Sequence, residues 1–476
     1  MRFPTKRISL SDAYRLATIL VFVYVCFIAA FGFFHGNVHT GDTDNLVKGA
    51  RAALDCLHLR VFRGCGLTPG SRATSVFPYP LLQYLPAAVL IKLGFSDQFV
   101  LRGLAGLSML SYASAFILVR RVVAPRADRI WGPFLALMLI ASPLSYYAVS
   151  SFGEMLSLVT ILAASVAALG RRTWPVVLLV FAGGLSKETM PPFVLGIVLL
   201  ITWRAEASIP RRRLRMTLLG LSALSAIATN LLFNVFRFAT WRNLNYLSPE
   251  YNVPLLRRAD FYAMLLFAPQ GGLLWFWPVA LGLLALVGVS LMIPRALHRE
   301  KAERRLVMAL LLLWATFLAG SASWVSPFGW IAWGPRLSLP LIPALSVASV
   351  SVGHARLQAM FRWIGARRGL SIAIGALVVL SALPQLALPW SHGRAIGALI
   401  AADDVCPGLM DTPVQRDRDL YFRCTSHVAW RLHPNQLSQA LRINPWQAWI
   451  ARGIGSAAIV SLLIAIWLGL HPTRRE

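Results

Sequence analysis

The chain has 476 residues, of which 57% are hydrophobic and only 14% are charged, and its mean hydropathy is +0.62. Soluble domains carry about a quarter charged residues, so a soluble fold of this size is excluded and most of the apolar side chains must face lipid. The net charge of +27 would indicate a nucleic-acid partner in a soluble protein, but basic cytoplasmic loops can produce it in a membrane protein.

Apolar runs near 20 residues long predict an all-α polytopic membrane protein with about twelve transmembrane helices, forming one domain over 1–476. The runs cover residues 16–34, 99–119, 131–147, 152–169, 175–185, 191–203, 216–236, 273–293, 306–321, 337–352, 370–388 and 448–470.

The charges alternate between the two faces that these spans define. With a cytoplasmic N-terminus, the inner segments hold 25 of the 46 basic residues but only 6 of the 19 acidic ones. Short, basic inner connections are what the positive-inside rule requires, so both termini are expected in the cytoplasm and no nucleic-acid partner is needed.

Three long loops fall on the outer face, at 35–98, 237–272 and 389–447, and long loops between spans usually carry function. The first and the last of these loops each hold two cysteines, which favours disulfides on an oxidising side, although free thiols are the alternative. The two candidate pairs are Cys56 with Cys65 and Cys406 with Cys424.

The first outer loop begins with an acidic motif, Gly41-Asp42-Thr43-Asp44, shortly after His39. Good helix formers follow, so Asp42 or Thr43 could simply cap a helix at the membrane interface. The functional alternative is that a carboxylate at the mouth of a membrane cavity deprotonates an acceptor hydroxyl or helps to bind a metal.

Later in the same loop, the segment 77–84 reads Phe-Pro-Tyr-Pro-Leu-Leu-Gln-Tyr and precedes an apolar run that is too short to span. The segment predicts a second interfacial helix that begins after a proline. Tyr79 and Tyr84 are expected either as ordinary interface aromatics or as the lining of a lipid-facing groove.

Two cations stand near the outer ends of spans. Lys187 lies in the turn Ser186-Lys187-Glu188 between two short apolar runs, and Arg336 begins a span beside Trp330 and Trp333. Burying the charge of a lysine there costs free energy unless the ammonium group binds an anion or pairs with Glu188. Alternatively, the side chain can extend along the apolar surface to place its charge in water, which is called snorkelling. The arginine could recognise a phosphate, or it could snorkel within an aromatic belt.

Glu154 begins another span at the same face, where an acid can simply be solvated. The chain contains no nucleotide-binding or zinc-protease motif. A secondary transporter should show a two-half repeat and charges in mid-membrane, and neither is present. A lipid-linked glycan flippase or polymerase would share the outer loops and stays open as an alternative.

The arrangement resembles the GT-C superfamily of membrane glycosyltransferases, which use polyprenyl-phosphate sugars. The motif around Asp42 is similar to their acidic first-loop motif. The segment 77–82 is similar to the aromatic-proline segment of the mannosyltransferase-like and arabinosyltransferase-like members. The segments 186–188 and 333–340 are similar to their later lysine turn and Gly-Arg helix start.

The resemblance implies an inverting transfer of a sugar from a polyprenyl-phosphate donor to a hydroxyl of a glycan, glycolipid or protein. Asp42, or else Asp44, would be the general base, and Lys187 and Arg336 would bind the leaving phosphate. His39, Tyr79, Tyr84, Glu154, Glu188, Trp330 and Trp333 would line the substrate groove. A divalent metal would not be obligatory. Because 41 of the 46 basic residues are arginine, we expect a bacterial inner membrane with an extracytoplasmic site.

Overall fold

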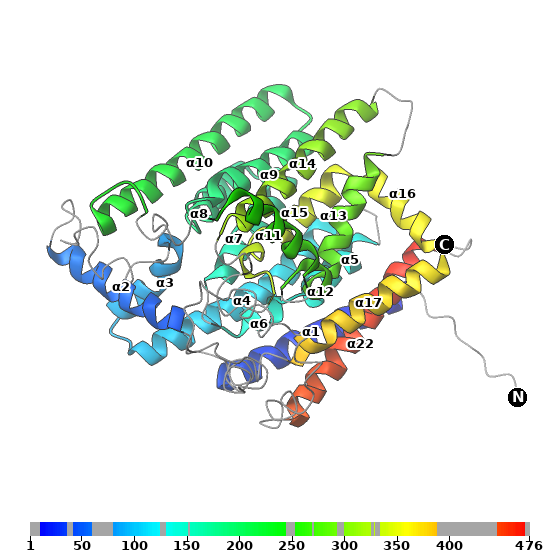
Figure 1. The fold of residues 1–476 in the computed structure, drawn as a ribbon, viewed down its shortest axis with the longest axis horizontal. Coiled ribbons are helices and arrows are strands. Elements are labelled where there is room, and N and C mark those ends of the chain that lie inside the picture. The colour runs from blue at the N-terminus through cyan, green and yellow to red at the C-terminus, as the bar shows by residue number, and fades with distance from the viewer. Residues whose placement is uncertain are drawn as a thin grey trace, which may run out of the picture.

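The structure is a computed structural model, and it describes residues 10–35, 41–59, 80–123, 130–150, 153–243, 253–268, 271–292, 299–324, 328, 334–387 and 445–471. These residues form helices joined by turns, with no strand among them (Figure 1). The all-helical fold class is therefore confirmed.

The first half of the chain contains ten helices in the described ranges. They are α1 (Leu10–His35), α2 (Gly41–Leu59), α3 (Leu81–Lys92), α4 (Asp97–Val123), α5 (Trp131–Ile140), α6 (Leu144–Ala148), α7 (Glu154–Leu169), α8 (Thr173–Gly184), α9 (Met190–Ala205) and α10 (Ile209–Phe238).

The second half adds α11 (Leu255–Phe267), α12 (Leu273–Phe276), α13 (Pro278–Ser290), α14 (Arg299–Ala322), η4 (Arg336–Ser338), α15 (Ile342–Val352), α16 (His354–Gly365), α17 (Arg368–Ala387) and α22 (Pro445–Leu470). Proline stands in the first turn of α9, α10, α13 and α15, where its missing N–H costs nothing.

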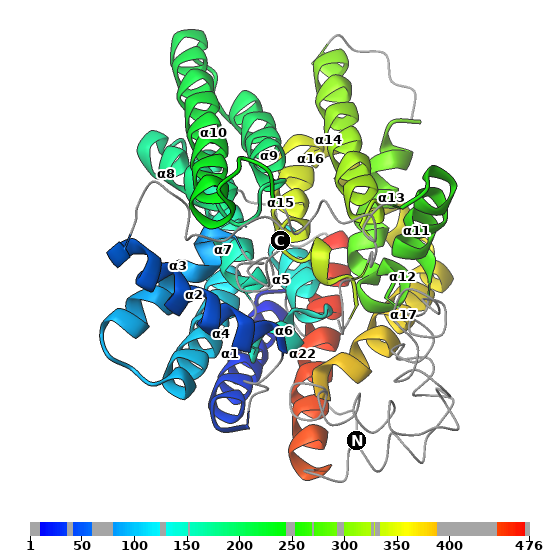
Figure 2. The same cartoon turned by 60° about the vertical axis from the view of Figure 1, so that its left-hand side comes forward.

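The main hydrophobic core lies between α5, α7, α9 and α15, whose contacts tie the two halves of the chain together. The first and last helices, α1 and α22, pack along each other at one side of this core (Figures 1 and 2). In Figure 2, α10, α9 and α14 project together from the opposite end of the molecule.

Each of the twelve expected spans coincides with a helix or a pair of consecutive helices, but the described residues do not confirm twelve continuous crossings. Among the described residues, five helices are long and apolar enough to cross a membrane: α1, α4, α10, α14 and α22. The bent pair α16 and α17, which meet at 102°, could supply a sixth. Several expected spans are shorter or broken. The run 131–147 divides into α5 and α6 at Pro143, and the run 273–293 divides into α12 and α13 at Pro278.

The first outer loop contains the two predicted short helices, α2 and α3, at one edge of the molecule (Figure 1). Leu46, Val47 and Ala50 of α2 and Tyr84 of α3 share a small hydrophobic cluster with the start of α4. The expectation that Asp42 or Thr43 caps α2 is wrong, because the helix begins at Gly41 and both residues lie within its first turn.

Candidate functional site

Glu154, the first residue of α7, forms a buried ion pair with Arg336 of η4. The Nε atom of Arg336 donates to Oε1 of Glu154 at 2.6 Å, and the side chains of Arg336 and Glu154 are only 9% and 12% exposed, respectively. Gly334 positions the arginine through a positive φ of +68°, and a Cβ at this glycine would lie 2.8 Å from the ring of Phe276. Neither a solvated Glu154 nor a snorkelling Arg336 fits this geometry.

Lys187 lies in the turn between α8 and α9 and is half-buried. Its ammonium group interacts electrostatically with Glu154, Arg336 and Glu188, so the turn brings the lysine to the Glu154–Arg336 pair. Burial lowers the pKa of Lys187, an effect that the two carboxylates oppose and the Arg336 charge reinforces. Within the described part of the chain, the Lys187 ammonium forms no hydrogen bond or ion pair of its own.

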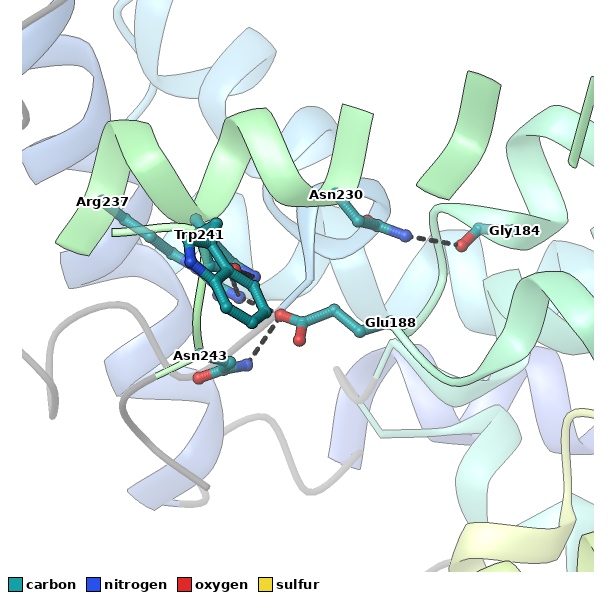
Figure 3. A network of polar contacts seen from close by, with 7 residues as sticks. Gly184, Glu188, Asn230, Arg237, Trp241 and Asn243 are labelled. Carbon is teal, nitrogen blue, oxygen red and sulfur yellow. Dashed lines mark hydrogen bonds and ion pairs between the residues drawn. The ribbon is translucent and has the colours of Figure 1, made fainter. Parts of the chain in front are cut away.

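Glu188 pairs with Arg237 at the end of α10 and not with its neighbour Lys187. The Nη2 atom of Arg237 lies 2.5 Å from Oε1 of Glu188, and the Nδ2 atom of Asn243 donates to the same oxygen at 2.7 Å. Figure 3 shows Glu188 directed from its turn toward Arg237, Trp241 and Asn243. The alternative of a Lys187–Glu188 pair is therefore not what the fold contains.

A polar stripe on α10, which the sequence reasoning missed, connects this helix to the turn. Asn230 donates to the carbonyl of Gly184 at 3.0 Å (Figure 3). Asn234 accepts hydrogen bonds from Arg237. These residues follow each other at intervals of four and three, so they share one face of the helix. Polar residues at that spacing inside an apolar helix were a signal available in the sequence.

The short helix α3 contacts both turns that carry the charged residues. The N–H of Leu82 donates to the carbonyl of Leu185 at 3.3 Å, two residues before Lys187. The Gln83 side chain packs against Gly153, immediately before Glu154, so closely that a Cβ at this glycine would lie 2.3 Å from Cγ of Gln83. The start of α3 thus holds the two turns in register.

The structure brings together Glu154, Lys187, Glu188 and Arg336 from the sequence-predicted set and adds Arg237 to them. We call these five residues the charged site. Tyr84 is 2% exposed and packs near Phe233, with ring centroids 6.1 Å apart, so it belongs to the α2–α3–α4 cluster.

The remaining predicted residues are only partly described or lie outside the described residues. The backbone of α2 carries Asp42, Asp44 and Cys56, but their side chains are not described. His39, Cys65, Tyr79, Trp330, Trp333, Cys406 and Cys424 lie outside the described residues. Among the side chains that are described, no group of three His, Cys, Asp or Glu residues could hold a metal ion.

No protein-family model and no curated protein matches this chain. Two solved structures are similar to it: ArnT from Cupriavidus metallidurans in the apo state and the same protein bound to undecaprenyl phosphate. The first is 14% identical, with a TM-score of 0.46 over 95% of this chain and 76% of that one. The second is 15% identical, with a TM-score of 0.43 over 96% of this chain and 76% of that one. Similarity at this level does not assign a function.

Proposed function

We propose that the protein is an integral-membrane glycosyltransferase that moves a sugar from a polyprenyl-phosphate donor to an acceptor hydroxyl. The single observation that carries this proposal is the Lys187 ammonium, half-buried beside the Glu154–Arg336 pair without a hydrogen-bonding partner among the described residues. The charged site has three cations and two carboxylates, so it needs one more anion to be neutral. A phosphate at the head of a lipid is an anion that a membrane helix bundle can bring to that position.

The proposed reaction is a displacement at the anomeric carbon of the sugar. The acceptor oxygen forms a bond to this carbon while the bond to the phosphate oxygen breaks, and the phosphate leaves with the electron pair. Lys187 and Arg336 would stabilise the negative charge that grows on the phosphate, an effect that is large in a site with little water. The hydroxyl proton would pass to the Asp42 carboxylate, with Asp44 as the second candidate.

The membrane context supports an acceptor at the extracytoplasmic face. The charged site lies at one end of α7, α8 and α10, and arginines lie at the opposite end of these helices. In α10, for example, Arg211–Arg213 lie at the start of the helix and Arg237 lies near its end. By the positive-inside rule, the arginine-rich end is expected in the cytoplasm. The acceptor would be a glycan, a glycolipid or a protein at that face of a bacterial inner membrane. A divalent metal could assist but would not be obligatory.

The test is sugar transfer by the purified protein in lipid nanodiscs. Undecaprenyl phosphate carrying an isotope-labelled sugar serves as the donor, because one similar solved structure binds this lipid, and total cell-envelope glycan serves as the acceptor. We expect labelled product from the wild type and at least about a hundredfold less from Lys187→Met, the loss of one charged transition-state contact. Lys92→Met is the matched control, because Lys92 is an exposed lysine at the end of α3.

A different result would reject the proposal. If a panel of pentose and hexose donors gave no product, while proteoliposomes took up a solute, the protein would be a transporter. If Lys187→Met transferred sugar as fast as Lys92→Met, the phosphate would bind elsewhere.

A further inference from the structure

Lys187 and Glu188 are neighbours of opposite charge, yet the fold keeps them from pairing. In a poorly hydrated site, a carboxylate next to an ammonium group would bind it and compete with any other anion. Glu188 instead faces α10, where Arg237 and Asn243 both contact its Oε1 atom. A carboxylate oxygen has two lone pairs, so these two donors satisfy Oε1.

Arg237 is itself held firmly in place. It is 1% exposed, and its Nε and Nη2 atoms donate to Oδ1 of Asn234 at 3.0 and 2.6 Å. Its guanidinium carbon lies 4.9 Å from the ring centre of Phe233 and 4.6 Å from that of Phe238. Asn234 in turn donates to the carbonyl of Trp241 at 3.1 Å, which fixes the chain after the helix. A rigid, fully buried cation is therefore directed at Glu188 (Figure 3).

We infer that Arg237 is a positioning residue that holds the Glu188 carboxylate away from Lys187, so that the Lys187 ammonium remains available to the phosphate of the lipid donor. This inference rests on the proposed function, because it assumes that the phosphate of a lipid donor binds at Lys187. Arg237 does not touch the substrate in this role. It removes the competing anion, and Asn243 assists it at the same oxygen.

The experiment measures binding of undecaprenyl phosphate to the full-length protein in nanodiscs, without sugar transfer. We expect Arg237→Gln to weaken binding about tenfold, because the released carboxylate then occupies Lys187 and one charge-assisted hydrogen bond to the phosphate is lost. The double variant Arg237→Gln/Glu188→Gln should bind within about twofold of the wild type, because the competing charge is gone. Arg237→Lys should retain most of the affinity.

Rescue by the second substitution is the decisive readout, because a merely structural Arg237 would leave the double variant as weak as the single one. Asn230→Leu controls for damage to the packing of α10, since Asn230 contacts Gly184 and not Glu188. Should Arg237→Gln fail to fold, Asn243→Leu removes the other donor to Oε1, and we expect a smaller loss that Glu188→Gln again restores.

Three results would overturn the inference: unchanged binding in Arg237→Gln, a double variant no better than the single one, or a wild type that does not bind undecaprenyl phosphate. Failure of the proposed function looks different. A wild type that binds the lipid and shows the rescue, but transfers no sugar, would reject the glycosyltransferase and leave the positioning role in place.

Discussion

Glu154 and Arg336 are 182 positions apart in the chain, and their side chains meet in a hydrogen-bonded ion pair of 2.6 Å at the centre of the charged site. The pair joins the start of α7 to η4. The second oxygen of Glu154, Oε2, is buried and accepts no hydrogen bond from the described residues. Among the described residues, Arg336 therefore supplies the side-chain hydrogen bond to the Glu154 carboxylate, and the Lys187 ammonium adds only a longer-range electrostatic interaction.

Removing Arg336 should consequently destabilise the protein. We expect Arg336→Met to lower the free energy of unfolding by about 3–5 kcal/mol, the usual cost of leaving one member of a buried pair without its partner. The double variant Arg336→Met/Glu154→Gln should recover most of that loss, because the buried carboxylate that Arg336 compensates is also removed. Thermal unfolding in detergent, followed by intrinsic tryptophan fluorescence, measures both changes.

The exposed pair between Arg51 of α2 and Asp97 of α4 provides the matched control. Its side chains are 48% and 56% exposed, so Arg51→Met should cost no more than about 1 kcal/mol. Equal melting temperatures for Arg336→Met and Arg51→Met would contradict a stabilising role for the buried pair.

Gly153 tests whether α3 keeps the two turns in register. An alanine Cβ at this position would lie 2.3 Å from Cγ and 2.4 Å from Cδ of Gln83, which is too close for any real contact. Gly153→Ala should therefore displace the start of α3 and lower both the melting temperature and the affinity for undecaprenyl phosphate. Gly153→Ala/Gln83→Ala should restore both, because the shortened side chain leaves room for the new methyl group.

The control for this prediction is Gly106→Ala in α4, where a Cβ would meet nothing within 4 Å. Alanine favours a helix over glycine by about 0.5–1 kcal/mol, so this variant should be as stable as the wild type or slightly more stable. If Gly153→Ala behaved like Gly106→Ala, the contact with Gln83 would not restrain α3.

Composition and periodicity were sufficient to predict the helices of the long apolar runs, because an apolar run long enough for the membrane must satisfy its backbone as a helix. They did not predict α11, which lies within the expected loop 237–272. Nor did they predict the break between α5 and α6, the break between α12 and α13, or the helix α16 before α17, because those boundaries depend on packing. The helix start at Gly41 shows the same limit at a finer scale.

Four members of the charged site could be selected from the sequence, because a charge at the end of an apolar run is costly and needs a reason. Their partners could not be selected. Lys187 next to Glu188 suggests a local pair, and only the path of α10 shows that Arg237 takes the glutamate. Arg237 was missed because it was assigned to the start of the loop 237–272, for which no functional role was predicted. Asn230 and Asn234 nevertheless precede it on one face of α10.

The titration of Lys187 gives a pH prediction. Burial disfavours the ammonium form and lowers the pKa of Lys187, so the charge is lost on raising the pH earlier than for an exposed lysine. The phosphate monoester has its second pKa near 6, so it carries its full negative charge throughout the alkaline range. Affinity for undecaprenyl phosphate should therefore fall as the pH is raised through the alkaline range, at a lower pH than the usual lysine pKa would give.

Lys187→Arg is the control for that titration, since a guanidinium stays protonated throughout this range. The variant should bind undecaprenyl phosphate with an affinity that does not fall over the same interval, even if the larger group binds less well at neutral pH. A parallel fall in both proteins would show that another group titrates.

The final prediction concerns the general base. Asp42 and Asp44 both lie in the first turn of α2, which α3 connects to the charged site through Leu82 and Gln83. Asp42→Asn should reduce sugar transfer by about 10²–10⁴-fold, the usual contribution of a positioned base, and should leave undecaprenyl phosphate binding unchanged. Asp44→Asn should transfer at a rate close to that of the wild type. The two measurements separate chemistry from binding, because Lys187→Met should lose both. If Asp44→Asn alone abolished transfer while still binding the lipid, the base would be Asp44; if neither substitution slowed transfer, the proton would leave by a route that does not use α2.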